Sequence, residues 1–386
     1  MTGKFWSARR TLLAFVSLAA ILFACVIGLK ILYGRGDSFA DVSTPPLLPQ
    51  SALETLVELN FPPGNIAVSP DGRIFFNYHP FAQAHRFTNA SVFELVDGNI
   101  QPYPDAAFQA KFQGVFGMTV DNQRRLWVTE PASLDHDHTK VLAFDIATGA
   151  LVFEYAFPVG QARFAQDLRV SPDGSTVIFA DTGFFRFTPA SLVILDVDSK
   201  KFRTVLLGHA STQPQNWMIK TPFGKHSLAF GLITFSVGVD GLAFSRDGSS
   251  LYFASMNHDT LYEIPYNDLV NEDLSEDEAG KRIRAVGRKP QSDGIAVNAH
   301  GDILITDVEN GGIARLTRSG KLETLVKDSR IIWADGVAVT PAGQVLFTDS
   351  AIPAYIDQLA RPPTRSLLQA GAPYRIYRFQ GDPISK

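Results

Sequence analysis

One pattern recurs six times along the chain and constrains the fold more than any other feature of the sequence. Each copy combines a small or acidic residue with a glycine, an apolar triplet, a turn, and a second apolar run that ends in an acidic or small polar residue. The apolar positions that correspond between the copies are Ile66, Met118, Leu168, Leu242, Ile295 and Val337. They lie about 40 to 75 residues apart, and repeats of this length indicate an array of similar structural units. We therefore expect six units.

The turns inside the repeats are typical of β-hairpins. Residues 69–72 and 171–174 both read Ser-Pro-Asp-Gly, and residues 245–248 read Ser-Arg-Asp-Gly. Such turns join antiparallel strands. A third and a fourth strand follow in most repeats, as at Lys140–Asp145 and Leu151–Phe157. Four strands per repeat at this period predict an all-β fold, a six-bladed β-propeller.

The sixth repeat has only three strands of its own, and the last of them is Tyr374–Phe379. A spare strand, Leu53–Leu59, stands before the first repeat. We therefore predict that this N-terminal strand closes the last blade, and that the propeller occupies residues 51–386.

The first 33 residues differ from the rest of the chain. Basic residues precede an uncharged stretch, Thr11–Leu29, which as a helix would span about 28 Å, close to the thickness of a bilayer core. Apolar residues resume after Lys30, which favours an uncleaved membrane anchor over a signal peptide. Cleavage after Ala40 is the alternative, and both interpretations export the remainder.

The basic residues around this stretch favour a propeller outside the cytoplasm, either anchored or secreted after cleavage. Residues 34–50 contain three prolines and are expected to form a linker between residues 1–33 and the propeller.

Composition excludes several classes of function. The formal net charge is −4, so the chain lacks the basic excess of a nucleic-acid-binding protein. Its one cysteine, Cys25, lies in the N-terminal apolar stretch, which excludes an intramolecular disulfide, a CxxC zinc site and a cysteine nucleophile in the globular part. No GxSxG, P-loop or HExxH motif is present. A small-molecule ligand is the expected partner, with membrane contact through the N-terminal helix only.

Propeller topology brings the starts of the first strands and the ends of the second strands to one face, which we call the upper face. Acidic residues stand at these positions in most repeats. At the starts of first strands they are Asp167, Asp240, Asp293 and Asp335, and at the ends of second strands they are Glu130, Asp181, Asp307 and Asp349. The sequence therefore predicts an acidic mouth around the propeller axis.

Long loops also emerge at the upper face, among them 351–373 and an insertion over 209–235 that contains Trp217 and His226. Loops on a rigid scaffold often carry binding residues. Histidines gather in the same segments, namely His79, His85, His136, His138, His209, His226 and His258. The residues expected to contact a ligand are Asp167, Asp181, Trp217, His226, Asp307, Asp335 and Asp349. The insertion is expected either to cover the channel as a lid or to pack as a surface flap.

Several segments resemble one known family. They are 61–69, 93–98, 102–104, 115–118, 126–128, 192–196 and 292–294, and the likeness extends in order over nearly all of residues 51–380. These segments are similar to the major royal jelly protein and yellow family, and more distantly to the gluconolactonase and paraoxonase group. The first resemblance implies secreted six-bladed propellers, some linked to dopachrome conversion and some to binding of biogenic amines. The second implies calcium-dependent lactone hydrolysis.

The distant resemblance also implies a metal position. In the lactone hydrolases the residues before the glycine of matching repeats bind metal, and those positions correspond here to Asp240 and Asp293. A hard cation such as Ca²⁺ prefers oxygen ligands and would relieve repulsion among converging carboxylates. The chain departs from that pattern before its first apolar triplet, where Pro63, Gly64 and Asn65 stand in place of an acid. An aspartate before glycine also caps backbone turns, so a structural role stays open.

Two functional classes follow from these observations. The first is a binding module whose acidic mouth accepts a small cationic or aromatic ligand through charge and cation–π contacts. The second is an enzyme, either a metal-dependent lactone hydrolase or a dopachrome-type isomerase, in which an upper-face His or Asp moves the proton. The missing N-terminal acid favours the first class.

Overall fold

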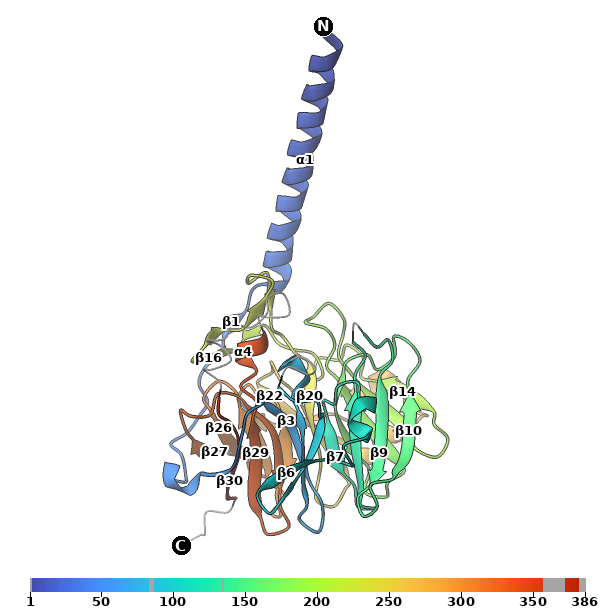
Figure 1. Cartoon of the computed structure of the whole chain (residues 1–386), viewed down its shortest axis with the longest axis vertical. Coiled ribbons are helices and arrows are strands. Elements are labelled where there is room, and N and C mark those ends of the chain that lie inside the picture. The colour runs from blue at the N-terminus through green and yellow to red at the C-terminus, as the bar shows by residue number, and fades with distance from the viewer. Residues whose placement is uncertain (1, 83–86, 134, 357–371, 382–386) are drawn as a thin grey trace.

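The computed structural model describes residues 2–82, 87–133, 135–356 and 372–381, and for residues 2–9 it describes the backbone only. His85 and most of the predicted loop 351–373 lie outside these residues. The described part confirms the expected all-β architecture, with six four-stranded sheets arranged as the blades of a propeller and a long helix before them. Figure 1 shows this helix rising from one face of the propeller.

Each blade has four antiparallel strands, numbered outward from the axis in chain order except in the last blade. The strands of blades one to three are β3 Pro63–Val68, β4 Ile74–Tyr78, β5 Val92–Val96, β6 Asn99–Pro102, β7 Met118–Val120, β8 Arg125–Glu130, β9 Lys140–Asp145, β10 Leu151–Ala156, β11 Ala165–Val170, β12 Thr176–Asp181, β13 Ser191–Asp196 and β14 Phe202–Val205. Those of blades four and five are β20 Val239–Phe244, β21 Ser250–Ser255, β22 Thr260–Pro265, β23 Arg284–Arg288, β24 Ile295–Val297, β25 Ile303–Asp307, β26 Gly312–Leu316 and β27 Leu322–Lys327.

The sixth blade is closed by a strand from the other end of the propeller, as predicted. Its strands, from the axis outward, are β28 Ala334–Val339, β29 Gln344–Asp349, β30 Tyr374–Gln380 and β2 Glu54–Leu59. β2 pairs with β30 in antiparallel register, with Leu59 opposite Tyr374. The chain then passes directly into blade one, so the ring is held shut by main-chain hydrogen bonds between distant parts of the sequence.

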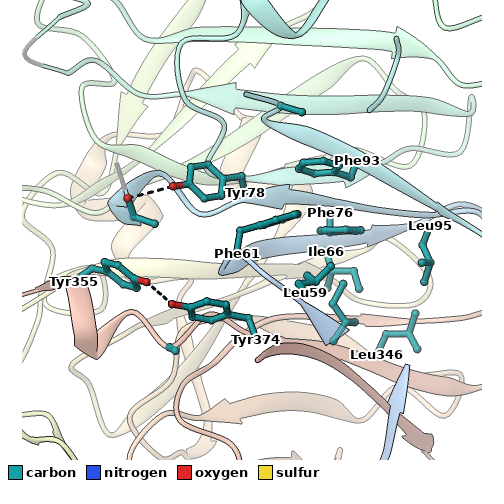
Figure 2. Close-up of a cluster of buried hydrophobic side chains, with 14 of the residues drawn as sticks. Leu59, Phe61, Ile66, Phe76, Tyr78, Phe93, Leu95, Leu346, Tyr355 and Tyr374 are labelled. Atoms are coloured by element: carbon teal, nitrogen blue, oxygen red, sulfur yellow. Dashed lines mark hydrogen bonds between the residues drawn. The ribbon is translucent and has the colours of Figure 1, made fainter. Parts of the chain in front are cut away.

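Apolar side chains fill the spaces between neighbouring blades. Figure 2 shows the cluster between blades six and one, where the ring centroids of Phe61 and Phe93 stack 4.8 Å apart. The hydroxyls of Tyr355 and Tyr374 pair beside it, which joins the short helix α4 (Pro353–Ile356) to the outer part of the last blade. The many phenylalanines of the sequence therefore serve mainly to pack blade against blade.

Two glycines of the repeated pattern show why the inner strands need this residue. A Cβ on Gly294 would lie 2.7 Å from the carbonyl oxygen of Asp335, and a Cβ on Gly336 would lie 2.8 Å from the Cα of Asn65. Both contacts are with the backbone of the next blade, so they cannot relax by moving a side chain. The repeated Asp-Gly pair thus sets how closely the blades approach at the axis.

The N-terminal helix, α1, spans Thr2–Tyr33. Within the described residues it is the one helix long and apolar enough to cross a membrane, over Arg10–Tyr33, a property that a signal sequence shares. Residues 34–50, for which the sequence predicts a linker, lie along the propeller. The backbone amides of Leu47 and Leu48 donate to the carbonyl oxygens of Thr324 and Leu325 on the outer strand of blade five.

The insertion between blades three and four forms short ribbons at the upper face, beside the lower end of α1 (Figure 1). Its strands are β15 Trp217–Met218, β16 Lys220–Thr221, β17 Gly224–Lys225, β18 Ser227–Leu228 and β19 Ile233–Thr234, and β15 pairs in parallel with β1 Asp37–Ser38. The other short helices within the described ranges are η1 Gln50–Ala52, η2 Pro80–Ala82, η3 Phe108–Lys111, α2 Tyr266–Val270 and α3 Glu276–Gly280.

Candidate functional site

The first strands of blades three, four and six begin with β-bulges, and these irregularities stand beside acidic residues at the axis. Register shifts occur between Ala165 and Asp167, between Val239 and Gly241, and between Ala334 and Val337. A bulge places two residues opposite one and re-aims the side chains beside it. In these three blades the bulge therefore lies next to the acidic residue at the start of the first strand.

Four aspartates from blades three to six gather at the axis. Asp240 is buried, and burial raises the pKa of its carboxyl well above the usual value, with further increases from the charges of Asp293, Asp167 and Asp335. Burial and the charge of Asp293 likewise raise the pKa of Asp335. Burial also raises the pKa of Asp293, to about 7. The predicted convergence of these carboxylates is thus present, and their mutual repulsion disfavours full ionisation.

Two of these carboxylates have fewer donors than a buried charge requires. Among the described residues, no hydrogen bond of good geometry reaches the buried Oδ2 of Asp335, although Nε2 of His79 lies 3.4 Å from it and a side-chain hydrogen bond from Ser350 lowers the pKa of Asp335. The pKa of Asp240 is raised by burial and by neighbouring acids, and no donor lowers it. Buried carboxylates are normally paired or hydrogen-bonded. Unpaired acceptors at the axis therefore mark the part of the site where a cation would be most stabilised.

Arg169 supplies an internal positive charge that our sequence analysis did not single out. Its Nη1 donates to Oδ1 of Asp167 at 2.9 Å, and its Nη2 lies 3.4 Å from the carbonyl oxygen of Ile295 in blade five. The guanidinium thus reaches from blade three to blade five across the axis. Oδ1 of Asp167 also accepts from the Nδ2 of Asn65 at 3.4 Å. Asp167 is therefore the best compensated of the four acids.

Trp333 closes one side of the acidic cluster. Its indole Nε1–H donates to Oδ2 of Asp293 at 2.7 Å, while its ring packs with Phe235 and Ile352 in a buried apolar cluster. Asp349 holds the Trp333 segment in place, because its carboxylate accepts from the backbone amides of Ile332 at 3.0 Å and Trp333 at 2.9 Å. Burial raises the pKa of Asp349 to about 6.

His79 faces the cluster from blade one with a defined tautomer. Its Nδ1 accepts from the backbone amide of Phe81 at 3.1 Å, so the proton of the neutral ring sits on Nε2. That nitrogen lies 3.4 Å from Oδ2 of Asp335. Burial lowers the pKa of His79 to about 3, so the ring is neutral at physiological pH. Phe81 and Phe116 pack beside it, with ring centroids 5.6 Å apart.

The acids at the ends of second strands share a different geometry. Asp181 accepts from the amide of Gly183 at 3.2 Å, Asp307 from the amide of Asn310 at 3.0 Å, and Glu130 from the amide of Gly114 at 3.2 Å. Burial raises the pKa of Asp181 and of Asp307 to about 6. These carboxylates thus secure the loops around the mouth, and ligand contact by Asp181, Asp307 and Asp349 stays a prediction.

The two predicted residues of the insertion occupy different places. Trp217 lies on β15 against the N-terminal segment, with its ring 5.3 Å from that of Phe39 in an edge-to-face contact. His226 is buried, its Nε2 lies 2.7 Å from the Oγ1 of Thr221, and its ring meets the ring of Trp333 at 5.9 Å. Burial lowers the pKa of His226 to about 4. His226 therefore packs behind the residue that contacts Asp293.

The chain matches one known protein family. The family model described as "Major royal jelly protein" matches residues 113–350, which is more than half of the chain. The chain belongs to the major royal jelly protein family. The resemblance inferred from sequence segments is confirmed. A search of curated proteins found no match to this family member.

Solved structures share the propeller of this royal jelly family member. A gluconolactonase from Xanthomonas campestris has 15% identity and a TM-score of 0.55, covering 90% of this chain and 98% of its own. Regucalcin from Agrobacterium tumefaciens, a calcium-binding protein, has 13% identity and a TM-score of 0.53, covering 85% of this chain and 94% of its own. A luciferin-regenerating enzyme has 13% identity and a TM-score of 0.54, covering 86% and 95%. At these identities the likeness shows the fold alone.

The donor set of this royal jelly protein fits a calcium ion only in part. Carboxylate oxygens suit a hard cation, and Asp240 offers them at the axis. Within the described ranges, however, no group of three or more His, Cys, Asp or Glu side chains is arranged to hold a metal. Oδ1 of Asp167 and Oδ2 of Asp293 are already engaged by Arg169 and Trp333. The predicted metal role of Asp240 and Asp293 stays a prediction.

Proposed function

We propose that this protein is an exported binding propeller that takes a small organic cation, such as a protonated aromatic amine, at the acidic cluster of its upper face. The observation that carries the proposal is the pair of undercompensated buried carboxylates, Asp240 and Asp335. An isolated buried charge is costly, whereas a cation bound between carboxylates lowers that cost and returns their pKa values towards normal.

The groups around the acids suit an organic cation better than a bare metal ion. Trp333, Phe81 and Phe116 adjoin the cluster through their contacts with Asp293 and His79. Aromatic faces attract ammonium groups, and they also pack against the ring of an aromatic ligand. Arg169 compensates Asp167 on the other side, so the net attraction for a cation is concentrated at Asp240, Asp293 and Asp335.

The second candidate is a metal-dependent lactone hydrolase, which the likeness to a gluconolactonase and to calcium-binding regucalcin favours. In that case Asp240 and Asp293 would hold the metal, which would polarise the substrate carbonyl. His79 is the nearest candidate to move a proton, but a pKa of about 3 makes it a weak base. A dopachrome-type isomerase would face the same difficulty, so we place binding first.

The test is thermal unfolding of the full chain in detergent after EDTA treatment. The additions are tyramine, its uncharged analogue 4-ethylphenol, or CaCl₂ alone. A ligand that binds only the folded state raises the unfolding temperature with its occupancy. We expect tyramine to raise it and 4-ethylphenol to leave it unchanged, because the ethylphenol skeleton is common to both and only the ammonium group differs.

Asp240→Asn is the matched variant, since it removes one charge and keeps the shape of the side chain. We expect it to weaken stabilisation by tyramine, whereas Asp302→Asn, at a part-buried ion pair with Arg315 outside the axial cluster, leaves stabilisation intact. If CaCl₂ raises the unfolding temperature and tyramine does not, the binding proposal is overturned in favour of the metal-dependent hydrolase. Stabilisation by neither addition would remove both.

A further inference from the structure

The lower end of α1 is fixed to the upper face of the propeller by direct contacts. The Nζ of Lys30 donates to the carbonyl oxygen of Gly231 in the insertion, and the ring of Tyr33 stacks on that of Phe187 with centroids 4.2 Å apart. Two residues after Tyr33, the carbonyl oxygen of Arg35 accepts a hydrogen bond from the Oγ1 of Thr234 at 3.1 Å. The helix therefore leaves the propeller in a direction set by packing, as Figure 1 shows.

Four phenylalanines on loops of the upper face are exposed. The exposed fraction is 42% for Phe184, 39% for Phe187, 41% for Phe223 and 79% for Phe230. These phenylalanines lie on two segments, residues 184–187 after the second strand of blade three and residues 223–230 in the insertion. We call these two segments together the aromatic rim. The first segment meets the end of α1 through Phe187, and the second meets it at Gly231, next to Phe230, so exposed rings stand where the apolar helix leaves the protein.

The backbone of the aromatic rim is unusual. Phe185 and Arg186 have φ values of 45° and 69°, and Ala229 and Phe230 have φ values of 50° and 61°. Bulky residues rarely adopt this left-handed conformation, which costs free energy and persists where the surroundings require it. The two strained residue pairs therefore lie next to exposed phenylalanine rings. Because these rings are exposed, they contribute little buried apolar area to the fold.

Basic side chains accompany the rings. Lys30 and Arg35 are exposed at the lower end of α1, and Lys225 is exposed in the insertion. Arg186, between Phe185 and Phe187, donates to Oδ1 of Asn216 and to the carbonyl oxygen of Arg35. Aromatic rings are enriched at the boundary between lipid and water, and Lys and Arg are attracted to anionic headgroups. Rings and cations together on one face match the chemistry of a bilayer surface.

We propose that the aromatic rim is a membrane-docking surface, and that its occupant is the outer part of the bilayer into which α1 inserts. The argument depends on α1 and the rim being continuous, because a helix that enters the bilayer from this face brings Phe187, Phe223 and Phe230 to the headgroup region. The upper face of the propeller then lies against the membrane, and a ligand reaches the acidic cluster from the lipid interface.

The experiment uses the full chain reconstituted in nanodiscs of zwitterionic and anionic phosphatidyl lipids. Cys25→Ser removes the single native thiol, and Phe223→Cys or Phe230→Cys then accepts an environment-sensitive NBD label. Lipids carrying a doxyl group near the headgroup quench a label only if it lies within the interface. We expect a blue shift and loss of about half of the emission at both positions, as for side chains buried 5–10 Å into the headgroup boundary.

Val96→Cys is the matched control, because Val96 is 37% exposed and lies at the hairpin turn of blade one, away from the upper face. Its label should show neither blue shift nor quenching. Equal emission at positions 96, 223 and 230 would overturn the proposal. Labelling two rim positions separately guards against a local disturbance at either one, and far-UV circular dichroism checks that each variant is folded. The result is independent of whether the acidic cluster binds an amine.

Discussion

The indole nitrogen of Trp333 donates a hydrogen bond of 2.7 Å to Oδ2 of Asp293, and this contact connects the acidic cluster to its apolar cover. Trp333 lies on the loop that precedes the last blade, and the carboxylate of Asp349 holds its backbone. An acid at the end of a second strand thus positions the tryptophan that contacts an acid at the start of a first strand. The two sets of acidic residues seen in the sequence therefore have different roles in the same site. Asp293 belongs to the acidic cluster, whereas Asp349 positions the residue that contacts it.

Asp293→Asn is expected to stabilise the ligand-free protein at pH 8. Burial raises the pKa of Asp293 from 3.8 to about 7, so folding favours its protonated form, and its contribution to stability falls as the pH rises through this interval. Asparagine does not ionise, so the stability advantage of the variant grows between about pH 4 and pH 7 and is constant above, reaching on the order of 4 kcal/mol. Thermal unfolding of both proteins across this range measures it. An equal loss of stability in the variant at every pH would contradict the prediction.

Trp333→Phe should lower stability by roughly 1 to 3 kcal/mol, because it removes the hydrogen-bond donor of a buried carboxyl. The loss should be larger at pH 8, where Asp293 is ionised, than at pH 6. Trp127→Phe is the control, since the Nε1 of Trp127 donates to Oδ2 of Asp121 at the same distance of 2.7 Å. Asp121 keeps its ion pair with Arg125, so this loss should not change between the two pH values. Denaturant unfolding of both variants at both pH values decides the matter.

Arg169→Met should weaken the ligand-free protein and strengthen its response to a cation. The substitution removes the positive charge that pairs with Asp167 at the axis, so the remaining carboxylates repel one another more strongly. We expect a lower unfolding temperature and a larger rise on adding tyramine. Arg315→Met is the control, because Arg315 pairs with Glu323 in blade five and should affect stability without affecting the tyramine response. A smaller rise in Arg169→Met than in wild type would show that Arg169 does not compete with the ligand.

Gly336→Ala should destabilise the ring by roughly 1 to 3 kcal/mol, the usual cost of forcing an extra carbon into a packed interior. Its Cβ would meet the backbone of Asn65 and Ile66 at 2.8 Å, which forces blades six and one apart. Gly28→Ala is the control, since a Cβ there meets nothing within 4 Å. Urea unfolding should give a clearly lower midpoint for Gly336→Ala than for Gly28→Ala. Equal unfolding midpoints would refute the idea that glycine is needed for the close approach of blades six and one.

Much of the fold could be predicted because its signals are local and repeated. The paired apolar runs recur in every repeat and Asp-Gly turns join them in three, so a single pattern read six times indicated the propeller and its number of blades. Closure by the N-terminal strand followed from counting strands, because the last repeat has only three strands and leaves the outer edge of β30 without a partner of its own. The upper face could be located for the same reason, since strand direction alternates regularly within each blade.

The sequence by itself determined the six-bladed ring, the identity of the closing strand and the face on which the acids lie. Only the tertiary structure decided which acids meet at the axis, because Asp167, Asp240, Asp293 and Asp335 come together from four different blades while Glu130 and Asp349 bond to nearby backbone amides. It also placed Arg169 across the channel and α1 against the insertion. These contacts join blades and segments far apart in the chain, and they depend on distances set by ring closure, which no local pattern of residues encodes.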